Sequence, residues 1–93
     1  MSNILKSYQF NYALKGTYYL EYLIKHRNID INIMRLYEEC AKHFNTTATQ
    51  VERACRYAIA EAFSNNEELF RSLYPRKLTK EPKLGDFIYN YDA

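Results

Sequence analysis

The chain has 93 residues, which is enough for one small domain and leaves no room for a second. Hydrophobic residues make up 47% of the chain and charged residues 26%, the proportions of an ordinary globular protein, and its apolar runs are too short to span a membrane. The net charge of +2 excludes a protein that binds polyanions through bulk charge alone.

The apolar residues recur with the 3.6-residue period of an α-helix and predict helices in six places. In chain order, these helices are expected to cover residues 2–9, 17–27, 31–44, 48–64, 66–74 and 84–91. The third and fourth have the most regular apolar stripes. No stretch of the sequence alternates in the manner of a strand. We therefore predict an all-α fold over residues 1–93, a compact bundle of about six short helices.

Residues that start or stop helices flank several of these segments. Asp30 precedes the third helix, and its carboxylate is expected to cap the first turn. Asn45 follows Phe44 and tolerates the left-handed conformation that ends a helix. Pro75 ends the fifth helix, because it cannot donate to the helical ladder. Residues 75–83, which are rich in Lys and Arg, are predicted to form a solvated loop.

The start of the fourth helix has two candidate capping boxes. In the first, Thr47 is the cap and Gln50 stands three residues later. In the second, Thr49 and Glu52 offer the same pairing two residues further on. The sequence leaves the choice between these two starts open.

The third and fourth helices are joined by a turn of three residues, Asn45-Thr46-Thr47. A turn this short disfavours an antiparallel pair and favours the steep crossing of a helix-turn-helix motif. Ala41 is small where the two helices would meet, and Val51 and Ala54 are expected to face inward. The alternative is an ordinary helical hairpin with a short loop.

With its apolar stripe turned inward, the fourth helix would expose a polar face near its start. Gln can bind adenine with two hydrogen bonds, Arg can bind guanine in the same way, and Glu can accept a bond from the cytosine amine. The first turns of such a helix are the part that enters the major groove. The alternative is a merely solvated face. The residues expected on this face are Thr49, Gln50, Glu52, Arg53, Arg56 and Tyr57.

The sequence resembles the C-terminal DNA-binding effector domain of the stage-zero sporulation response regulator. The most specific part is the block N-T-T-A-x-x-V-E-R-A, which begins at Asn45. Further matching residues are Lys15-Gly16, Tyr19-Leu20, Leu36-Tyr37, Ala41-Lys42, Arg56, Ala58-Ile59 and, more loosely, Lys80, Pro82, Lys83 and Phe87-Ile88. The resemblance implies six helices around a central helix-turn-helix and a transcription regulator that binds double-stranded DNA.

The resemblance also implies roles for single residues. Bases would be read from the positions of Gln50, Glu52 and Arg53. Gln50 departs from the family, which typically has Arg there, so the family's target sequence should not be assumed. Tyr57 also departs, since the family commonly has His at that position. Because the chain begins shortly before the resembling segment, we expect an effector domain without the family's receiver domain.

Charge is distributed unevenly between the predicted motif and its flanks. Residues 45–64 carry two bases and two acids, whereas residues 65–83 carry five bases and three acids. Phosphate contacts are therefore expected to come largely from flanking segments. We assign Thr47, Thr49 and Arg56 to holding the helix against the DNA backbone, with Lys80 and Lys83 as supporting phosphate contacts. Further cations that could reach a phosphate are Lys6, Lys15, Arg71, Arg76 and Lys77.

A homodimer is expected through the C-terminal helix, at Phe87, Ile88 and Tyr91, because the resemblance places a dimer contact nearby. Ten tyrosines are too many for the helix faces to bury, and exposed Tyr is typical of interfaces. This surplus and the low net charge keep open an alternative function. In that alternative the chain is a protein-interaction or inhibitor module that has kept the fold without binding DNA.

Neither catalysis nor metal binding is indicated. Cys40 and His43 are three residues apart on one helix but have no apparent third ligand, and both Cys40 and Cys55 are expected in the core. There is no Gly-rich phosphate loop and no set of nucleophile, base and orienting residue. We expect no enzyme activity, no cofactor and no metal. With only two cysteines and no signal peptide, a cytoplasmic location is expected.

Overall fold

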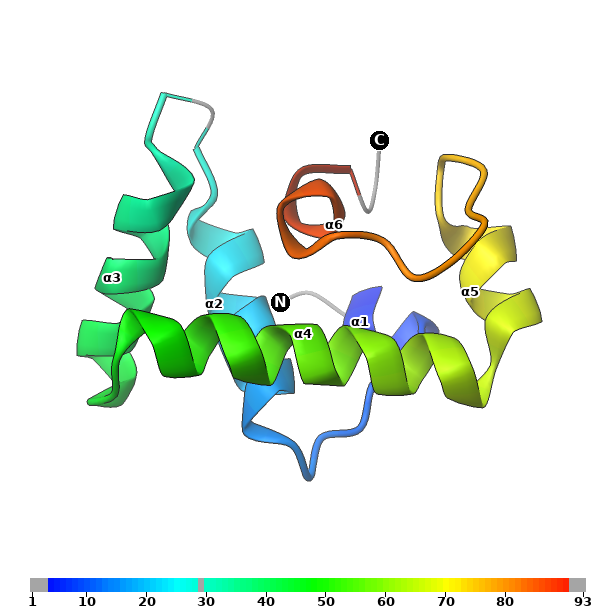
Figure 1. Ribbon diagram of the computed structural model, residues 1–93, viewed down its shortest axis with the longest axis horizontal. Helices are drawn as coiled ribbons and strands as arrows, with labels where there is room; N and C mark the ends of the chain where they lie inside the picture. The colour runs from blue at the N-terminus through cyan, green and yellow to red at the C-terminus, as the bar shows by residue number, and fades with distance from the viewer. Residues whose placement is uncertain (1–3, 29, 91–93) are drawn as a thin grey trace.

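The computed structural model describes residues 4–28 and 30–90, and Figure 1 shows their arrangement. All regular structure in these two ranges is helical, which confirms the predicted all-α class. No helix in the described ranges is long and apolar enough to cross a membrane. The helices in these ranges are α1 (Ile4–Ser7), α2 (Lys15–His26), α3 (Ile33–Phe44), α4 (Ala48–Asn65), α5 (Glu67–Leu73) and α6 (Leu84–Asn90).

Among the described residues, three helix boundaries differ by two residues from the sequence-based expectation. Helix α2 begins at Lys15 rather than at residue 17. Helix α1 ends at Ser7, because Gln9 takes a positive φ of 59° and the N–H groups of Gln9 and Phe10 turn back to the carbonyls of Lys6 and Leu5. Helix α3 begins at Ile33, and its cap is a different residue from the expected one.

The predicted Asp30 cap is wrong. The side-chain oxygen of Asn32 accepts a 2.8 Å hydrogen bond from the Met34 N–H and caps α3. Asp30 lies too far before the helix, and its own N–H donates to the side chain of Asn28 at 2.9 Å. Three polar capping residues at alternate positions compete here, and the one adjacent to the first helical turn forms the cap.

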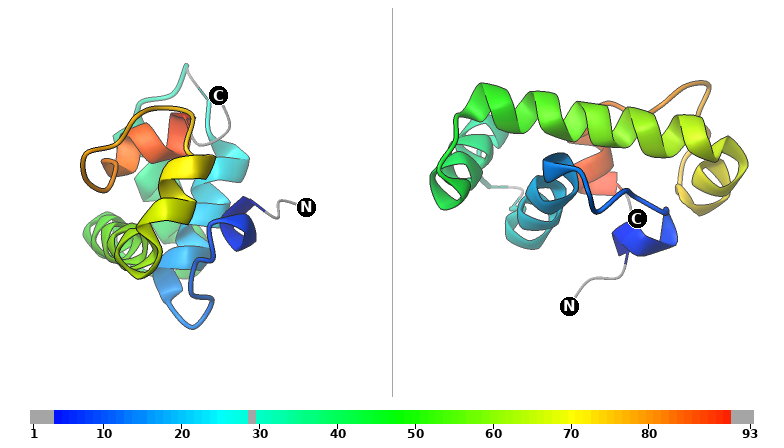
Figure 2. Two further views of the ribbon diagram at one scale, coloured as in Figure 1. Left: turned by 90° about the vertical axis from the view of Figure 1, so that its right-hand side faces the viewer. Right: turned by 90° about the horizontal axis from the view of Figure 1, so that it is seen from below.

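Helix α4 is the long element against which the other helices pack. It runs across the domain in Figure 1, with α2 and α3 crossing it near its start and α5 following its end. Contacts are most extensive between α2 and α4, and α4 also packs on α3, α5 and α6. In the left view of Figure 2, α4 and the loop before α6 lie on one side of the domain and α1 lies on the other.

The crossing of α2 and α4 is unusually close. A Cβ atom added at Gly16 would stand 2.0 Å from the backbone oxygen of Ala54, far inside contact distance. The Cys55 thiol lies 3.8 Å from the Gly16 carbonyl oxygen, and Thr17 is fully buried while its hydroxyl donates to the Asn11 carbonyl at 2.6 Å. Only glycine at position 16 allows the two backbones to approach this closely.

The other end of α4 packs into an aromatic cluster. The Phe70 ring lies at its centre, with ring centroids 4.6 Å from Tyr8, 5.5 Å from Phe63 and 5.8 Å from Phe87. The cluster joins Tyr8, directly after α1, to rings of α4, α5 and α6 in the second half of the chain. Some tyrosines are also exposed, as expected: Tyr18 is 44% exposed and Tyr57 61%.

The surface expected for a homodimer is partly inside the core. Phe87 and Ile88 are completely buried within one chain, so they cannot form a contact between two chains. This part of the dimer prediction is wrong, because the apolar face of α6 is covered by the domain's own helices. Tyr91 lies outside the described residues.

Both cysteines are in the core, as predicted. Cys40 and Cys55 are free and buried, and burial raises the pKa of the Cys40 thiol to about 12 and that of Cys55 further. The His43 ring packs on the Tyr22 ring with centroids 4.8 Å apart. Across the described residues, no three His, Cys, Asp or Glu side chains gather into a group that could hold a metal ion.

The close crossing predicts that Gly16→Ala is strongly destabilising. The added methyl would push against the α4 backbone, which cannot rotate away as a side chain can, and we expect a loss of about 1–3 kcal/mol or more in the free energy of unfolding. Urea denaturation measures it. Gly85→Ala is the matched control, because its Cβ would meet only the terminal methyl of Ile33 at 3.3 Å. Equal effects at both glycines would contradict the prediction.

Candidate nucleic-acid interface

The turn between α3 and α4 is closed by its own backbone. Asn45 takes the left-handed conformation, with φ 58° and ψ 51°, as predicted. The Thr46 N–H donates to the Ala41 carbonyl at 2.8 Å and the Asn45 N–H to the Lys42 carbonyl at 3.3 Å. These two bonds satisfy carbonyls at the end of α3 and turn the chain sharply toward α4.

Thr47 is the residue that caps α4. It has extended backbone angles, and its hydroxyl oxygen accepts a 3.2 Å hydrogen bond from the Gln50 N–H. Helix α4 therefore begins at Ala48, so Thr47 is the cap, as in the first of the two predicted starts, and the start capped by Thr49 is excluded. The cap fixes the helical register, and thereby decides which side chains of the first turns face outward.

One side of α4 is sealed into the domain and the other is open. The inward side is buried and comprises Val51, Cys55, Ala58, Ile59, Ala62 and Phe63. Ala54 is only half-buried, although its backbone meets α2. Among the residues expected to contact DNA, Glu52 is half-buried and the others on this helix and its cap are exposed, namely Thr47, Thr49, Gln50, Arg53, Arg56 and Tyr57.

Glu52 and Arg56 form an ion pair along the helix. Their side chains approach to 2.6 Å between the guanidinium and the carboxylate, one turn apart. The Arg56 side chain is 65% exposed, so the pair contributes little to stability. Arg53 forms no ion pair within the described part of the chain, and its fork of donors is available to a ligand.

A groove runs beside the open face of α4. It has a volume of about 660 Å³ and lies between α3, α4 and the segment leading into α6. Arg56 and Ile59 line it from α4, Tyr37 lines it from α3, and residues 80–86 line it from the loop and the start of α6. The groove thus brings Lys80 and Lys83 close to Arg56, although they are far apart in sequence.

Tyr37 is a member of this groove that the sequence analysis did not single out. It falls on the apolar stripe of α3, and its ring is buried as such residues usually are. Burial and the nearby Glu52 carboxylate raise its pKa to about 12. The phenol therefore keeps its proton and can act as a neutral hydrogen-bond donor. Tyr37 is recognisable as part of the groove only because it lies near residues 80–86, and the sequence does not reveal that proximity.

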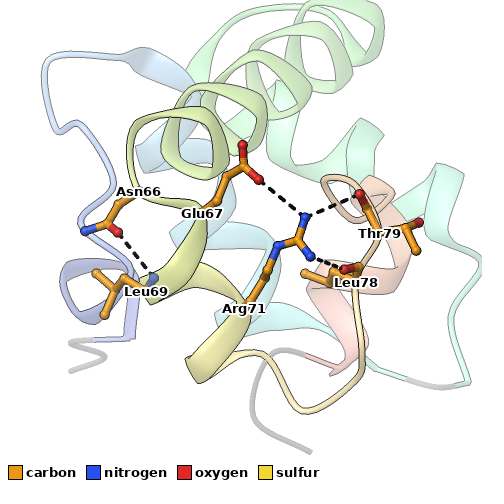
Figure 3. Close-up of polar contacts among 6 residues, drawn as sticks. All are labelled: Asn66, Glu67, Leu69, Arg71, Leu78 and Thr79. Atoms are coloured by element: carbon orange, nitrogen blue, oxygen red, sulfur yellow. Dashed lines mark hydrogen bonds and ion pairs between the residues drawn. The ribbon is translucent and has the colours of Figure 1, made fainter.

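Arg71 is engaged inside the domain. Its guanidinium donates to the carbonyl oxygens of Leu78 and Thr79, in the loop that carries Lys80 (Figure 3). The sequence suggested a phosphate contact for this residue, but its donors are already directed at the protein backbone.

Two helices joined by a tight three-residue turn, the second with an open polar face, are consistent with a helix-turn-helix domain. The family model described as the sporulation initiation factor Spo0A C terminal matches residues 1–90. The chain belongs to this family, which confirms the resemblance carried by the block after Asn45. The family is one of DNA-binding transcription regulators in sporulation and is not an enzyme family.

The Thr47 cap predicts a stability difference between two neighbouring threonines. Thr47→Ala removes the bond to the Gln50 N–H and should lower the free energy of unfolding by about 1 kcal/mol. Thr49→Ala removes an exposed hydroxyl inside the helix and should change it by less than about 0.5 kcal/mol. Thermal or urea denaturation compares the two variants. A larger loss of stability for Thr49→Ala than for Thr47→Ala would show that Thr47 is not the cap.

Proposed function

We propose that this domain binds double-stranded DNA in a sequence-specific manner and regulates transcription, with the start of α4 placed in the major groove. The observation that carries the proposal is the open face of α4, where Gln50 and Arg53 are exposed directly after a capped turn. Family membership supports the same function. The side chains on this face are of the types that distinguish bases by hydrogen bonding.

Each polar residue of the face has a role in the proposal. Gln50 and Arg53 read base edges, with adenine and guanine as their respective preferences. Glu52 accepts a hydrogen bond from a cytosine amine once Arg56 leaves it for a phosphate. Breaking this exposed ion pair costs little, so the pair does not prevent binding. Tyr57, exposed one turn after Arg53, contacts the sugar-phosphate backbone together with Thr47 and Thr49.

Phosphate attraction comes from the groove beside α4. The α4 segment is electrically neutral, whereas Lys80 and Lys83 add positive charge on the same side of the domain. Figure 2 supports this placement, since the loop before α6 and α4 face the same side. In the proposal, base recognition and phosphate binding are therefore supplied by different elements.

A mobility-shift assay on nonspecific duplex at low salt tests the function as a whole. A DNA-binding domain retards the duplex, and the retardation fades steeply as salt is added. The alternative, a protein-interaction module, shows no retardation and migrates as an oligomer or with a partner. The feature that favours this alternative is Tyr57, which is 61% exposed in the middle of the open face.

Arg53→Ala should change specificity. Loss of the two-pronged contact should weaken binding to the preferred site by about 1–3 kcal/mol and relax the preference at one base. Selection from random duplexes measures the preference. Arg35→Ala is the control, because Arg35 is an exposed arginine on α3 that pairs with Glu39 and is not part of α4. Recovery of one consensus by wild type and Arg53→Ala would contradict the assigned role.

Lys80→Ala should change affinity alone. We expect binding to all sequences to weaken by a similar factor and the slope of log affinity against log salt to fall by about one. Titrations of specific and nonspecific duplex over a range of salt concentrations measure both. Lys6→Ala removes the same charge from α1, across the domain from α4, and should leave the slope unchanged. An unchanged slope for Lys80→Ala would exclude a phosphate contact there.

A further inference from the structure

The loop between α5 and α6 is held by very few main-chain interactions. Residues 75–82 lie between Leu73, where α5 ends, and Leu84, where α6 begins. Although all of them are described, they form no backbone–backbone hydrogen bond with the described chain. Two apolar contacts attach the loop to the core, since Pro82 is buried and Leu78 packs against the core. These side-chain contacts hold the loop against the core, but they do not determine how its peptide groups are oriented.

Arg71 provides the missing orientation. One nitrogen of its guanidinium donates to the Leu78 carbonyl at 2.9 Å, and the other donates to the Thr79 carbonyl at 3.4 Å. The two acceptors are consecutive peptide groups immediately before Lys80. Figure 3 shows both bonds reaching across from α5 to the loop.

The guanidinium is itself fixed by two further contacts. It pairs with the Glu67 carboxylate at 3.3 Å, one turn earlier on α5, and it lies over the Phe63 ring at 5.5 Å from the ring centroid. Helix α5 is in turn capped by Asn66, whose side chain accepts from the Leu69 N–H at 3.2 Å. The chain of contacts therefore runs from the end of α4 through Arg71 to the loop.

We infer that Arg71 is a positioning residue for phosphate binding, which holds Lys80 and Lys83 beside α4 without contacting DNA itself. The inference rests on the proposed function. A lysine at position 71 would keep the positive charge but lacks the planar fork that bonds two carbonyls while remaining paired with a carboxylate. Charge and positioning can therefore be separated by one conservative substitution.

A double-mutant cycle on duplex DNA tests the inference. Affinity and its salt slope are measured for wild type, Arg71→Lys, Lys80→Ala/Lys83→Ala, and the variant that combines all three substitutions. In the wild-type background, we expect Arg71→Lys to weaken DNA binding by about threefold to tenfold and to lower the salt slope. In the Lys80→Ala/Lys83→Ala background, we expect the same substitution to change the affinity by less than about twofold. Equal losses in both backgrounds, or wild-type affinity for Arg71→Lys, would overturn the role of Arg71.

The cycle also distinguishes this inference from the function on which it rests. If wild-type protein does not bind duplex at low salt, the proposed function and the inference both fall. If wild type binds and its two lysines matter, but the effect of Arg71→Lys is additive, the inference alone falls. A loss that appears only when Lys80 and Lys83 are present supports it, because a general loss of folding would affect both backgrounds.

Limited trypsin digestion gives a readout that needs no DNA. Arg71→Lys leaves the number of tryptic sites unchanged, so cleavage rates after Lys77 and Lys80 report on the order of the loop. We expect these rates to rise about threefold or more relative to wild type. Arg35→Lys, an exposed residue in the same kind of i,i+4 pair on α3, should leave them unchanged. Equal cleavage of Arg71→Lys and wild type would show that Arg71 does not order the loop.

Discussion

The close contact between α2 and α4 at Gly16 and Ala54 is the constraint on which the rest of the domain depends. Because the two backbones nearly touch, the rotation of α4 about its own axis is set at this point. Val51, Cys55 and Ala58 are then directed into the core, and the opposite side of the helix is exposed within the described part of the chain. Small residues at a helix crossing allow this approach, whereas a larger side chain would separate the helices and loosen the packing around them. The open face of α4 is thus a result of packing on its buried face.

A second contact, at the other end of α4, explains how elements far apart in sequence meet beside this helix. The aromatic cluster around Phe70 fixes α1, α5 and α6 against the second half of α4 and determines where the segment after α5 must pass. Pro82 and Leu84 are buried as that segment returns to the core, while Lys83 between them and Lys80 before them are left at the surface near Arg56. The neutral helix and the basic segment become neighbours because both pack on the core beneath them.

Sequence reasoning predicted those features that depend on local chemistry. The apolar period gave the helices, Asn45 and Thr47 predicted the turn, and the outward residues of α4 followed from its stripe. It failed where several local solutions were equivalent or where distant segments decide. Asn28, Asp30 and Asn32 are all competent caps, and only the final position of the first turn selects Asn32. Phe87 and Ile88 are buried, and the rings that cover Phe87 come from residues as distant in sequence as Tyr8 and Phe10, which periodicity cannot show. The proximity of Lys83 to Arg56 also depends on tertiary packing, as do the hydrogen bonds from Arg71 to the loop.

The separation of the neutral α4 face from the basic loop has an evolutionary consequence. In the proposed complex, exchanging Gln50 for another residue would redirect the domain to a new operator while leaving its Coulombic attraction to any duplex intact. Altering the charge of the loop would retune sensitivity to ionic strength and leave the operator unchanged. Paralogues built on this scaffold can therefore diverge in the genes they address and in the ionic conditions they tolerate along two independent mutational routes.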